Sequence, residues 1–452
     1  MFTILNRSCS FLFLVVLLTT ATTAQKVPPV AVEVSANRLV AADPDNQPLV
    51  EPHVAIDPEN RQHWLAGVIA ASPDLKSTDC AALVSFDGGQ TWDRHNLGLK
   101  QCYDPWTGIL PDGTGLLTVI GNESSDLMVY RSDDGGRTWR NPASLGDSQD
   151  HGTFVIGRTG KYAGKIFVAS QQGATEKASG ETRDTVFVAQ SIDGGRTFQE
   201  PVRVFPSNLH ITTMNPALLS DGTLLIPYSD FGRDAVDGKG TVWLSLDRER
   251  DWLLRSTDGG HTLLAPTLVS ESCSKTFGML AVDGSNSLFR DRVYWLCNDG
   301  AHENIYLHFS PDGGEHWSRP VRVNQNSGPA PDVRNAVIAV SPYGVVAVTW
   351  YDARGDQRSN MEFLRCQELY FAASLDGGQT FLPEVRVGVK SCPLSPKNGE
   401  AGIRYVAGGD YDGMVTTPDG RFHLLWSDSR DGIYKLWTAS VTVNDRPASG
   451  KP

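Results

Sequence analysis

Short apolar runs recur along the whole chain and are separated by Gly, Asp, Asn and Pro, and no long stretch has the periodicity of an amphipathic helix. Such runs predict short β-strands joined by turns. The runs come in groups of three, of which the first comprises HVAIDP from His53, WLAGVIAAS from Trp64 and AALVSF from Ala81. The last group comprises YDGMVTT from Tyr411, FHLLWSD from Phe422 and KLWTASV from Lys435.

Each of the first six groups ends in a glycine-rich octapeptide. The first is SFDGGQTW at Ser85, and the others are SDDGGRTW at Ser132, SIDGGRTF at Ser191, STDGGHTL at Ser256, SPDGGEHW at Ser310 and SLDGGQTF at Ser374. A further strand-like run such as PVRVF or EVRVG comes after the octapeptide. A repeat of this length indicates a solenoid, a propeller or an array. Three strands, a turn and a fourth strand make one blade of an all-β propeller.

The seventh group has no octapeptide, because the octapeptide joins strands three and four and the chain ends after strand three. The run AVEVSA from Ala31 precedes the first group and is not part of any of the seven groups of three. We predict that it is the fourth strand of blade seven, which closes the ring and leaves no open sheet edge. Seven blades of four strands are favoured, in a single domain spanning residues 25–452. Six blades stay possible if one group is an insertion.

The repeated aspartates are interpreted as turn-forming residues. An aspartate accepts hydrogen bonds from nearby amides, glycine supplies positive φ, and the terminal Trp or Phe can bury its ring under the hairpin. A catalytic residue is not needed at six positions around a ring. The six residues concerned are Asp87, Asp134, Asp193, Asp258, Asp312 and Asp376. A calcium loop is the lesser alternative, since the oxygen ligands are few and too regularly spaced for an EF-hand.

The first 24 residues have the features of a secretory signal peptide. Arg7 supplies a positive charge, an apolar run follows from Phe11 to Leu18, and small residues precede Gln25. The run is short for a membrane span, and no later segment is apolar enough to span a bilayer. We expect a secreted or periplasmic protein. The formal net charge of −12 argues against nucleic acid as a partner.

Six cysteines remain after Cys9 in the signal segment is set aside, and an even number in an oxidising compartment indicates disulfides. In a propeller the loops between strands two and three share a face with the loops that join successive blades. All six cysteines fall on that face, so neighbouring pairs are expected. The pairs are Cys80–Cys102, Cys273–Cys297 and Cys366–Cys392.

The six octapeptides resemble the Asp-box, or BNR, repeat of sialidases and related secreted propellers, and the resemblance covers most of the chain after the signal segment. Sialidases of this superfamily use three arginines for the substrate carboxylate, a tyrosine nucleophile assisted by a glutamate, and an aspartate as acid and base. Their first arginine usually lies in an F/Y-R-I-P motif, where this chain reads EPHVAID with His53 and no arginine. They also usually have six blades.

Substrate-binding candidates are the residues expected at the inner ends of the blades. Arginine binds carboxylates through two parallel hydrogen bonds, so the arginines of blades six and seven indicate an acidic sugar. The candidates are Arg334, Arg354, Arg404, Arg430 and His53. Arg354 and Arg430 occupy matching places in WYDAR and WSDSR, and an Asp–Arg brace between blades is the alternative reading for both.

The catalytic candidates follow from the same resemblance and position. Tyr411 opens the last blade, where the superfamily's tyrosine nucleophile is expected, and Glu123 is the candidate base. Asp104 or Asp150 is the candidate acid, because glycoside cleavage needs two groups that flank the bond. No metal-binding motif such as HExxH or CxxC and no phosphate-binding glycine loop occurs, so no cofactor or metal is expected.

Three functions are consistent with this sequence. The first is a secreted, sialidase-like exo-glycosidase acting on an acidic sugar. The second is a non-catalytic Asp-box propeller that binds glycans or proteins. The third is a uronate lyase, in which an arginine neutralises the carboxylate and a histidine or tyrosine moves the proton, with His53, His151 and His210 as the histidines available.

Overall fold

The structure is a computed structural model. It describes residues 31–41, 47–72, 77–175, 182–206, 210–236, 242–271, 273, 278–299, 303–325, 332–354, 356, 365–392 and 408–444. The predicted signal peptide and Arg404 lie outside the described residues. No helix in the described part of the chain is long and apolar enough to cross a membrane.

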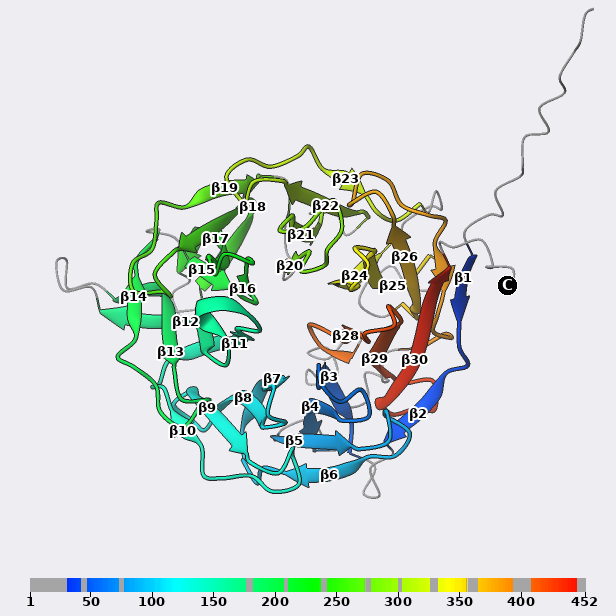
Figure 1. The fold of residues 1–452 in the computed structure, drawn as a ribbon, viewed down its shortest axis with the longest axis horizontal. Helices are drawn as coiled ribbons and strands as arrows, with labels where there is room; N and C mark the ends of the chain where they lie inside the picture. The colour runs from blue at the N-terminus through cyan, green and yellow to red at the C-terminus, as the bar shows by residue number, and fades with distance from the viewer. Residues whose placement is uncertain are drawn as a thin grey trace, which may run out of the picture.

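Seven antiparallel sheets are arranged around a central axis, so the seven-bladed propeller is confirmed (Figure 1). Strands are given from the innermost, strand one, to the outermost, strand four. Blade one consists of β3 (Leu49–Ile56), β4 (Trp64–Ala71), β5 (Thr78–Ser85) and β6 (Asp93–Asn96), and blade two of β7 (Cys102–Ile109), β8 (Gly115–Gly121), β9 (Asp126–Ser132) and β10 (Ala143–Ser144). Blade three consists of β11 (Gln149–Ile156), β12 (Ile166–Thr175), β13 (Thr182–Ser191) and β14 (Val202–Val204).

Blades four to six follow in the same order around the ring. In blade four, β15 (His210–Thr213) and β16 (Ala217–Leu218) together form strand one, followed by β17 (Leu224–Val236), β18 (Val242–Ser256) and β19 (Thr267–Ser270). Blade five consists of β20 (Met279–Val282), β21 (Val293–Asn298), β22 (Ile305–Ser310) and β23 (Val321–Arg322). Blade six consists of β24 (Val333–Val340), β25 (Val346–Asp352), β26 (Glu368–Ser374) and β27 (Val385–Arg386).

Blade seven contains both ends of the described chain. It consists of β28 (Gly413–Thr416), β29 (Phe422–Asp428), β30 (Lys435–Asn444) and the N-terminal β1 (Ala31–Val34). β1 pairs antiparallel with the end of β30, with Val32 opposite Val443 and Val34 opposite Val441. The predicted closing strand is therefore confirmed. The structure adds β2 (Arg38–Ala41), which pairs with the beginning of the same β30.

The glycine-rich octapeptides form the turns between strands three and four, as the sequence predicts. In the first, Ser85 Oγ donates to Asp87 Oδ1 (2.8 Å) and accepts from the amide of Gly89 (2.9 Å), while Thr91 Oγ1 donates to Asp87 Oδ2 (2.6 Å). The hydrogen bonds from Thr91 hold the pKa of Asp87 far below its ordinary value. Both carboxylate oxygens are thus used inside the turn.

The apolar core lies between neighbouring blades, which bury the faces of their sheets against one another. Phe371 of blade six meets Phe422 of blade seven with ring centroids 5.6 Å apart. Val32 and Val34 of the closing strand pack against the same cluster. Removing apolar surface from water is the main favourable term in such packing, at roughly 25 cal/mol per Å².

The three disulfides join the pairs expected from the sequence: Cys80–Cys102, Cys273–Cys297 and Cys366–Cys392. Blade four has the longest strands among the described residues. Its hairpin of β17 and β18 continues well beyond Ser229, with register shifts on the way. Charged residues such as Asp230 and Arg233 interrupt the apolar run there, and backbone pairing does not require apolar side chains.

The closing strand gives a testable prediction. Val34→Asp puts a charge into the contact between β1 and the blade six–blade seven cluster, so it should lower the melting temperature by several degrees. Ala31→Asp adds the same charge on the exposed side of β1 and should leave the melting temperature nearly unchanged. Equal effects of the two substitutions, measured by thermal unfolding followed by circular dichroism, would contradict the closing role.

Candidate functional site

Four of the innermost strands, which surround the axis in Figure 1, have a β-bulge near their beginning. Each bulge contains a residue other than glycine with φ in the left-handed region: Glu51 (53°), Asp104 (53°), His151 (52°) and Asn335 (50°). Such residues are uncommon and gather at functional sites, and bulges redirect side chains. The bulges place four polar residues at equivalent positions in blades one, two, three and six.

Asp104 and His151 come together from the bulges of neighbouring blades. The amide of His151 donates to Asp104 Oδ2 (3.2 Å), and His151 Nδ1 lies 3.4 Å from Asp150 Oδ2. The Asp150 side chain is 53% exposed and that of His151 is 14% exposed. Two aspartates, one facing solvent and one held beneath it, therefore flank a histidine.

The charges in this group shift its pKa values in opposite directions. Burial raises the pKa of Asp104 to about 6, and the charge of Asp150 adds to this while His151 opposes it. Burial alone would lower the pKa of His151, but the charges of Asp150, Asp104 and Asp410 raise it to about 10. Burial acts to raise the pKa of Asp150, but the charge of His151 together with hydrogen bonds from His151 and Asp104 lowers it overall. At neutral pH the group contains an imidazolium and an ionised Asp150.

Asp410 connects this group to blades one, six and seven. Its amide donates to Oε1 of the buried Glu51 (3.3 Å). Asn335 Nδ2 donates to the carbonyl of Gly409 (2.7 Å), which fixes the segment that carries Asp410. Acidic residues of blades one, two, three and seven thus converge on one region.

An aromatic wall stands beside the acidic group. Trp106 stacks on His53 with ring centroids 3.7 Å apart and meets Tyr411 edge-on at 6.2 Å. A cavity of about 30 Å³ lies among these residues, and its lining includes Asp104, Trp106, His151, Thr213 and Tyr411. The cavity has room for about one water molecule, whereas ligand pockets measure roughly 300–1,000 Å³. A sugar ring would therefore have to lie against its mouth, where aromatic faces and a carboxylate meet.

His53, a predicted substrate-binding residue, lies behind this wall. Its Nδ1 accepts a hydrogen bond from the amide of Thr107 (3.0 Å), and burial lowers its pKa to about 3. His53 is therefore neutral, with its proton on Nε2. Its observed contacts support the ring of Trp106.

Arg354 and Arg430 make the contacts expected of braces. Arg354 Nη2 donates to Asp352 (2.6 Å), another of its nitrogens pairs with Glu384, and the guanidinium stacks on Tyr370. Arg430 Nε donates to Asp428 (2.8 Å), and its guanidinium stacks on Trp437 and contacts Asn37. Each arginine thus braces its own blade, six or seven, whereas the sequence interpretation placed the Asp–Arg brace between blades.

The remaining candidates from the sequence, Arg334, Glu123 and Tyr411, lie at different distances from the acidic group. Arg334 directly precedes the bulge residue Asn335 and donates from Nε to Asp332 Oδ1 (2.8 Å). Glu123 is exposed in the turn between β8 and β9, and no described contact joins it to Tyr411. Tyr411 is buried and lines the small cavity with Asp104 and His151. The structure therefore brings Tyr411, Asp104 and Asp150 together without Glu123.

From the sequence, Glu51, Trp106 and Asp410 are expected at the inner ends of the blades without a specific role, and Thr213 and Asn335 are not singled out. One signal in the sequence could have found some of them. A polar residue interrupts the apolar alternation at the beginning of an inner strand, as Glu51 does in LVEPHVAI. An interruption of that kind indicates a bulge.

The Asp104–Asp150–His151 group has ligand atoms within 4.8 Å of one another, so these residues could hold a metal ion. A divalent cation there would have to displace the proton that the acidic charges keep on His151.

Comparison with known proteins gives similarity at the level of the repeat and the fold. The BNR/Asp-box repeat family matches residues 83–94. No curated protein matches the sequence. Similar solved structures include an α-L-arabinanase of Penicillium chrysogenum with bound arabinobiose, at 15% identity over 70% of this chain and 94% of that chain, with a TM-score of 0.46. Another is a Hadza microbial sialidase, at 14% identity over 91% and 92% of the two chains, with a TM-score of 0.45.

The imidazolium state of His151 can be tested by pH. Its folded pKa of about 10 lies above the ordinary 6.5, so its stabilising effect is fully present below pH 6.5 and is lost as the pH rises through about 10. We expect the melting temperature to fall between pH 7 and pH 10, and to fall less steeply in Asp150→Asn. An imidazole NMR titration that places the pKa of His151 near 6.5 would contradict this assignment.

Proposed function

We propose that this protein is a glycoside hydrolase that cleaves a glycan at the axial end of the inner strands. The observation that carries the proposal is the pair formed by Asp104 and Asp150. Their environments move their pKa values apart, so one carboxyl group can donate a proton while the other stays ionised. Glycosidic cleavage uses one carboxyl group in each of these two states. The oxygens of this pair lie within 4.8 Å of one another, nearer than the roughly 5–5.5 Å between the acid and the nucleophile of a retaining enzyme, so the pair serves as an acid–base unit and the nucleophile is a separate residue.

Each residue of the site has a role in this proposal. Asp104, with a pKa of about 6, protonates the leaving oxygen. The ionised Asp150 stabilises the positive charge that develops on the sugar ring. His151 keeps Asp150 ionised and fixes the position of Asp104 through its amide. Trp106 provides an apolar face for the sugar.

Tyr411 is the proposed nucleophile, as the resemblance to sialidases implies. A tyrosine needs a nearby base to attack an anomeric carbon. The groups that line the same cavity include Asp104 and His151, whereas Glu123 lies in an exposed turn. In this proposal the base is the ionised Asp150, because Asp104 holds the proton for the leaving oxygen.

The histidines favour hydrolysis over a lyase reaction. A lyase base must be able to take a proton from the carbon next to the carboxylate. His151 is already protonated at neutral pH because its pKa is about 10. His53 has its Nδ1 bonded to an amide and lies behind Trp106. Neither of these two is placed or charged to act as that base. The third histidine, His210, pairs through Nδ1 with Asp184 in blade three.

The charge of the site favours a neutral sugar over an acidic one. Asp104 lines the hollow, the negative charges of Asp150 and Asp410 act on Asp104, and negative charges this close repel an anionic ligand. The described arginines proposed to bind a carboxylate are each paired with an aspartate two residues before them. Sialic acid or a uronate would need one of these pairs to open.

The role of Asp104 gives a sharp kinetic prediction. Asp104→Asn should lower kcat on unactivated glycosides by at least about 100-fold, because the leaving oxygen is no longer protonated. The loss should be much smaller for dinitrophenyl glycosides, whose leaving group needs no proton. In the unmodified protein, kcat/KM should fall above about pH 6, because Asp104 loses its proton there. The pH profile of the variant should show no such decrease.

Two other substitutions complete this experiment. Asp147→Asn changes an exposed aspartate in the loop before β11 and should leave the kinetics unaltered. Glu123→Gln tests the base that the sequence predicted. A loss in Glu123→Gln equal to that in Asp104→Asn, or a loss in Asp104→Asn independent of the leaving group, would count against the proposed acid.

The substrate class is tested by a screen of neutral aryl glycosides, sialosides and uronides. We expect release of a reducing sugar from a neutral glycoside. Release of sialic acid would support the sialidase-like alternative, and a new ultraviolet absorbance from an unsaturated uronate would support the lyase. Binding of glycans without any product would indicate a non-catalytic propeller.

A further inference from the structure

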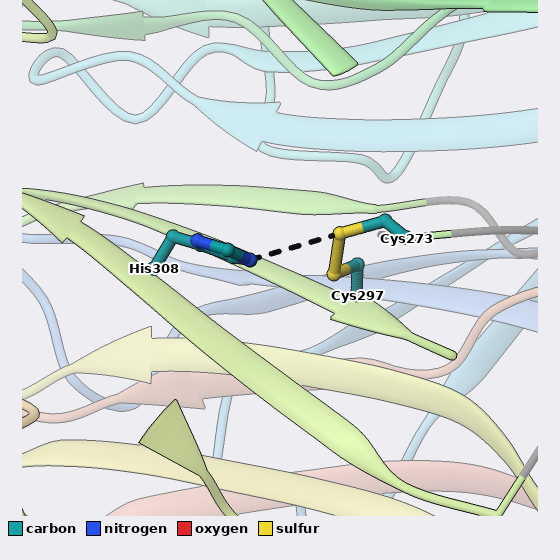
Figure 2. Close-up of side chains that lie close together, drawn as sticks. All are labelled: Cys273, Cys297 and His308. Atoms are coloured by element: carbon teal, nitrogen blue, oxygen red, sulfur yellow. Dashed lines mark hydrogen bonds between the residues drawn. A yellow bond between two sulfur atoms is a disulfide. The ribbon is translucent and has the colours of Figure 1, made fainter. Parts of the chain in front are cut away.

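Blade five contains a histidine next to a disulfide, away from the site proposed above. The bond between Cys273 and Cys297 lies beside His308, whose Nε2 is 3.9 Å from Cys273 Sγ (Figure 2). All three side chains are buried, with exposed fractions of 3%, 2% and 3%. The three residues therefore form one enclosed group of potential soft-metal ligands.

The position of His308 is set by the sheet and does not depend on the disulfide. Cys297 lies on β21 opposite Tyr306 of β22, and His308 is two residues further along β22, opposite Trp295. Cys297 and His308 are thus diagonal neighbours on one face of an antiparallel pair. Breaking the disulfide leaves this pairing intact.

The ring of His308 is oriented as a metal-binding histidine would be. Its Nδ1 faces the backbone carbonyl of Ser318 at 3.4 Å, so Nδ1–H is the donor and the lone pair is on Nε2, toward the sulfur. A backbone carbonyl on the second ring nitrogen is a common partner of zinc-binding histidines. Burial lowers the pKa of His308, so the imidazole is neutral.

The spacing also fits zinc. With Zn–S bonds of about 2.3 Å and Zn–N bonds of about 2.0–2.1 Å, a tetrahedral site places sulfur and nitrogen about 3.6 Å apart. The observed 3.9 Å is close to that value. In the reduced protein the two sulfurs need to separate to about 3.8 Å, which is within the reach of rotations about their side-chain bonds.

We propose that reduction of the Cys273–Cys297 bond converts this group into a zinc site with two thiolates and one imidazole. A thiol reductant supplies two electrons and two protons, which break the S–S bond and give two thiols, while the reductant becomes a disulfide. Zn²⁺ then displaces the two thiol protons, His308 Nε2 forms the third bond, and a water molecule takes the fourth position.

The other two disulfides differ in this respect. Among the described residues, Cys273–Cys297 is the disulfide with a third ligand atom within 4.8 Å. Cys80–Cys102 and Cys366–Cys392 are therefore matched controls within the same chain.

The test uses the full chain in a Cys9→Ser background, so that the only cysteines left are the six that form disulfides. The protein is reduced anaerobically, freed of reductant and titrated with Zn²⁺, and bound metal is measured by mass spectrometry. Cd²⁺ provides a second readout through its thiolate charge-transfer absorbance. We expect one tightly bound zinc per reduced chain and none in the oxidised protein.

His308→Gln should weaken zinc binding by at least about tenfold, since losing even an outer-shell partner of a metal ligand has an effect of that size. Its oxidised form keeps the disulfide, and its melting temperature checks that it folds. Paired serine substitutions at Cys80 and Cys102, or at Cys366 and Cys392, should retain the site. Zinc binding unchanged in His308→Gln, or lost equally in the control pairs, would overturn the proposal, as would a reduced chain that binds no zinc.

Discussion

Antiparallel pairing of β1 with β30 joins the two ends of the described chain in one sheet, and the arrangement of the other blades depends on it. Each blade can bury its apolar faces only against its neighbours, so an incomplete blade seven would expose the clusters on both of its sides. A closed ring also keeps unpaired sheet edges short and protected. Closure thus provides the rigid frame that the axial site requires.

The site depends on that frame because its residues come from separate blades. Asp104 and His151 belong to neighbouring inner strands, and Asp410 is held by contacts with blades one and six. Left-handed backbone at the bulges is unfavourable for residues other than glycine, and it persists where the surrounding structure fixes it. The interblade packing thus holds the strained positions, and these bring the acidic groups close enough to shift one another's pKa values.

The same pattern of polar groups fixed by the sheet occurs in blade five, where His308 faces a disulfide, and in the Asp–Arg pairs of blades six and seven. Arg354 and Arg430 each bond to an aspartate two residues earlier in the sequence and stack on an aromatic ring of a neighbouring strand. Such pairs contribute orientation more than energy, because the cost of desolvating both charges offsets much of their attraction.

The sequence by itself determined the architecture. The six octapeptides indicated six turns between strands three and four. The seventh group, which has no octapeptide, indicated that the ring is closed by a strand from elsewhere in the chain, and AVEVSA was identified as that strand. The disulfide pairs followed from the loops on which the cysteines lie. These features are local or periodic, and turn chemistry and strand alternation can be read along a chain.

The composition of the candidate site was decided by the tertiary structure. Asp104, Asp150 and Tyr411 could be named from their expected loop positions. The sequence could not show that Glu123 lies apart from them. It also left open whether Arg354 and Arg430 are braced. Trp106 and Asp410 had no distinguishing signal. Which inner ends meet depends on bulges and on contacts between residues such as Glu51 and Asp410, which are 359 positions apart in the chain. The pKa of a carboxyl group depends on burial and on charges from other blades, and neither is encoded in its local sequence.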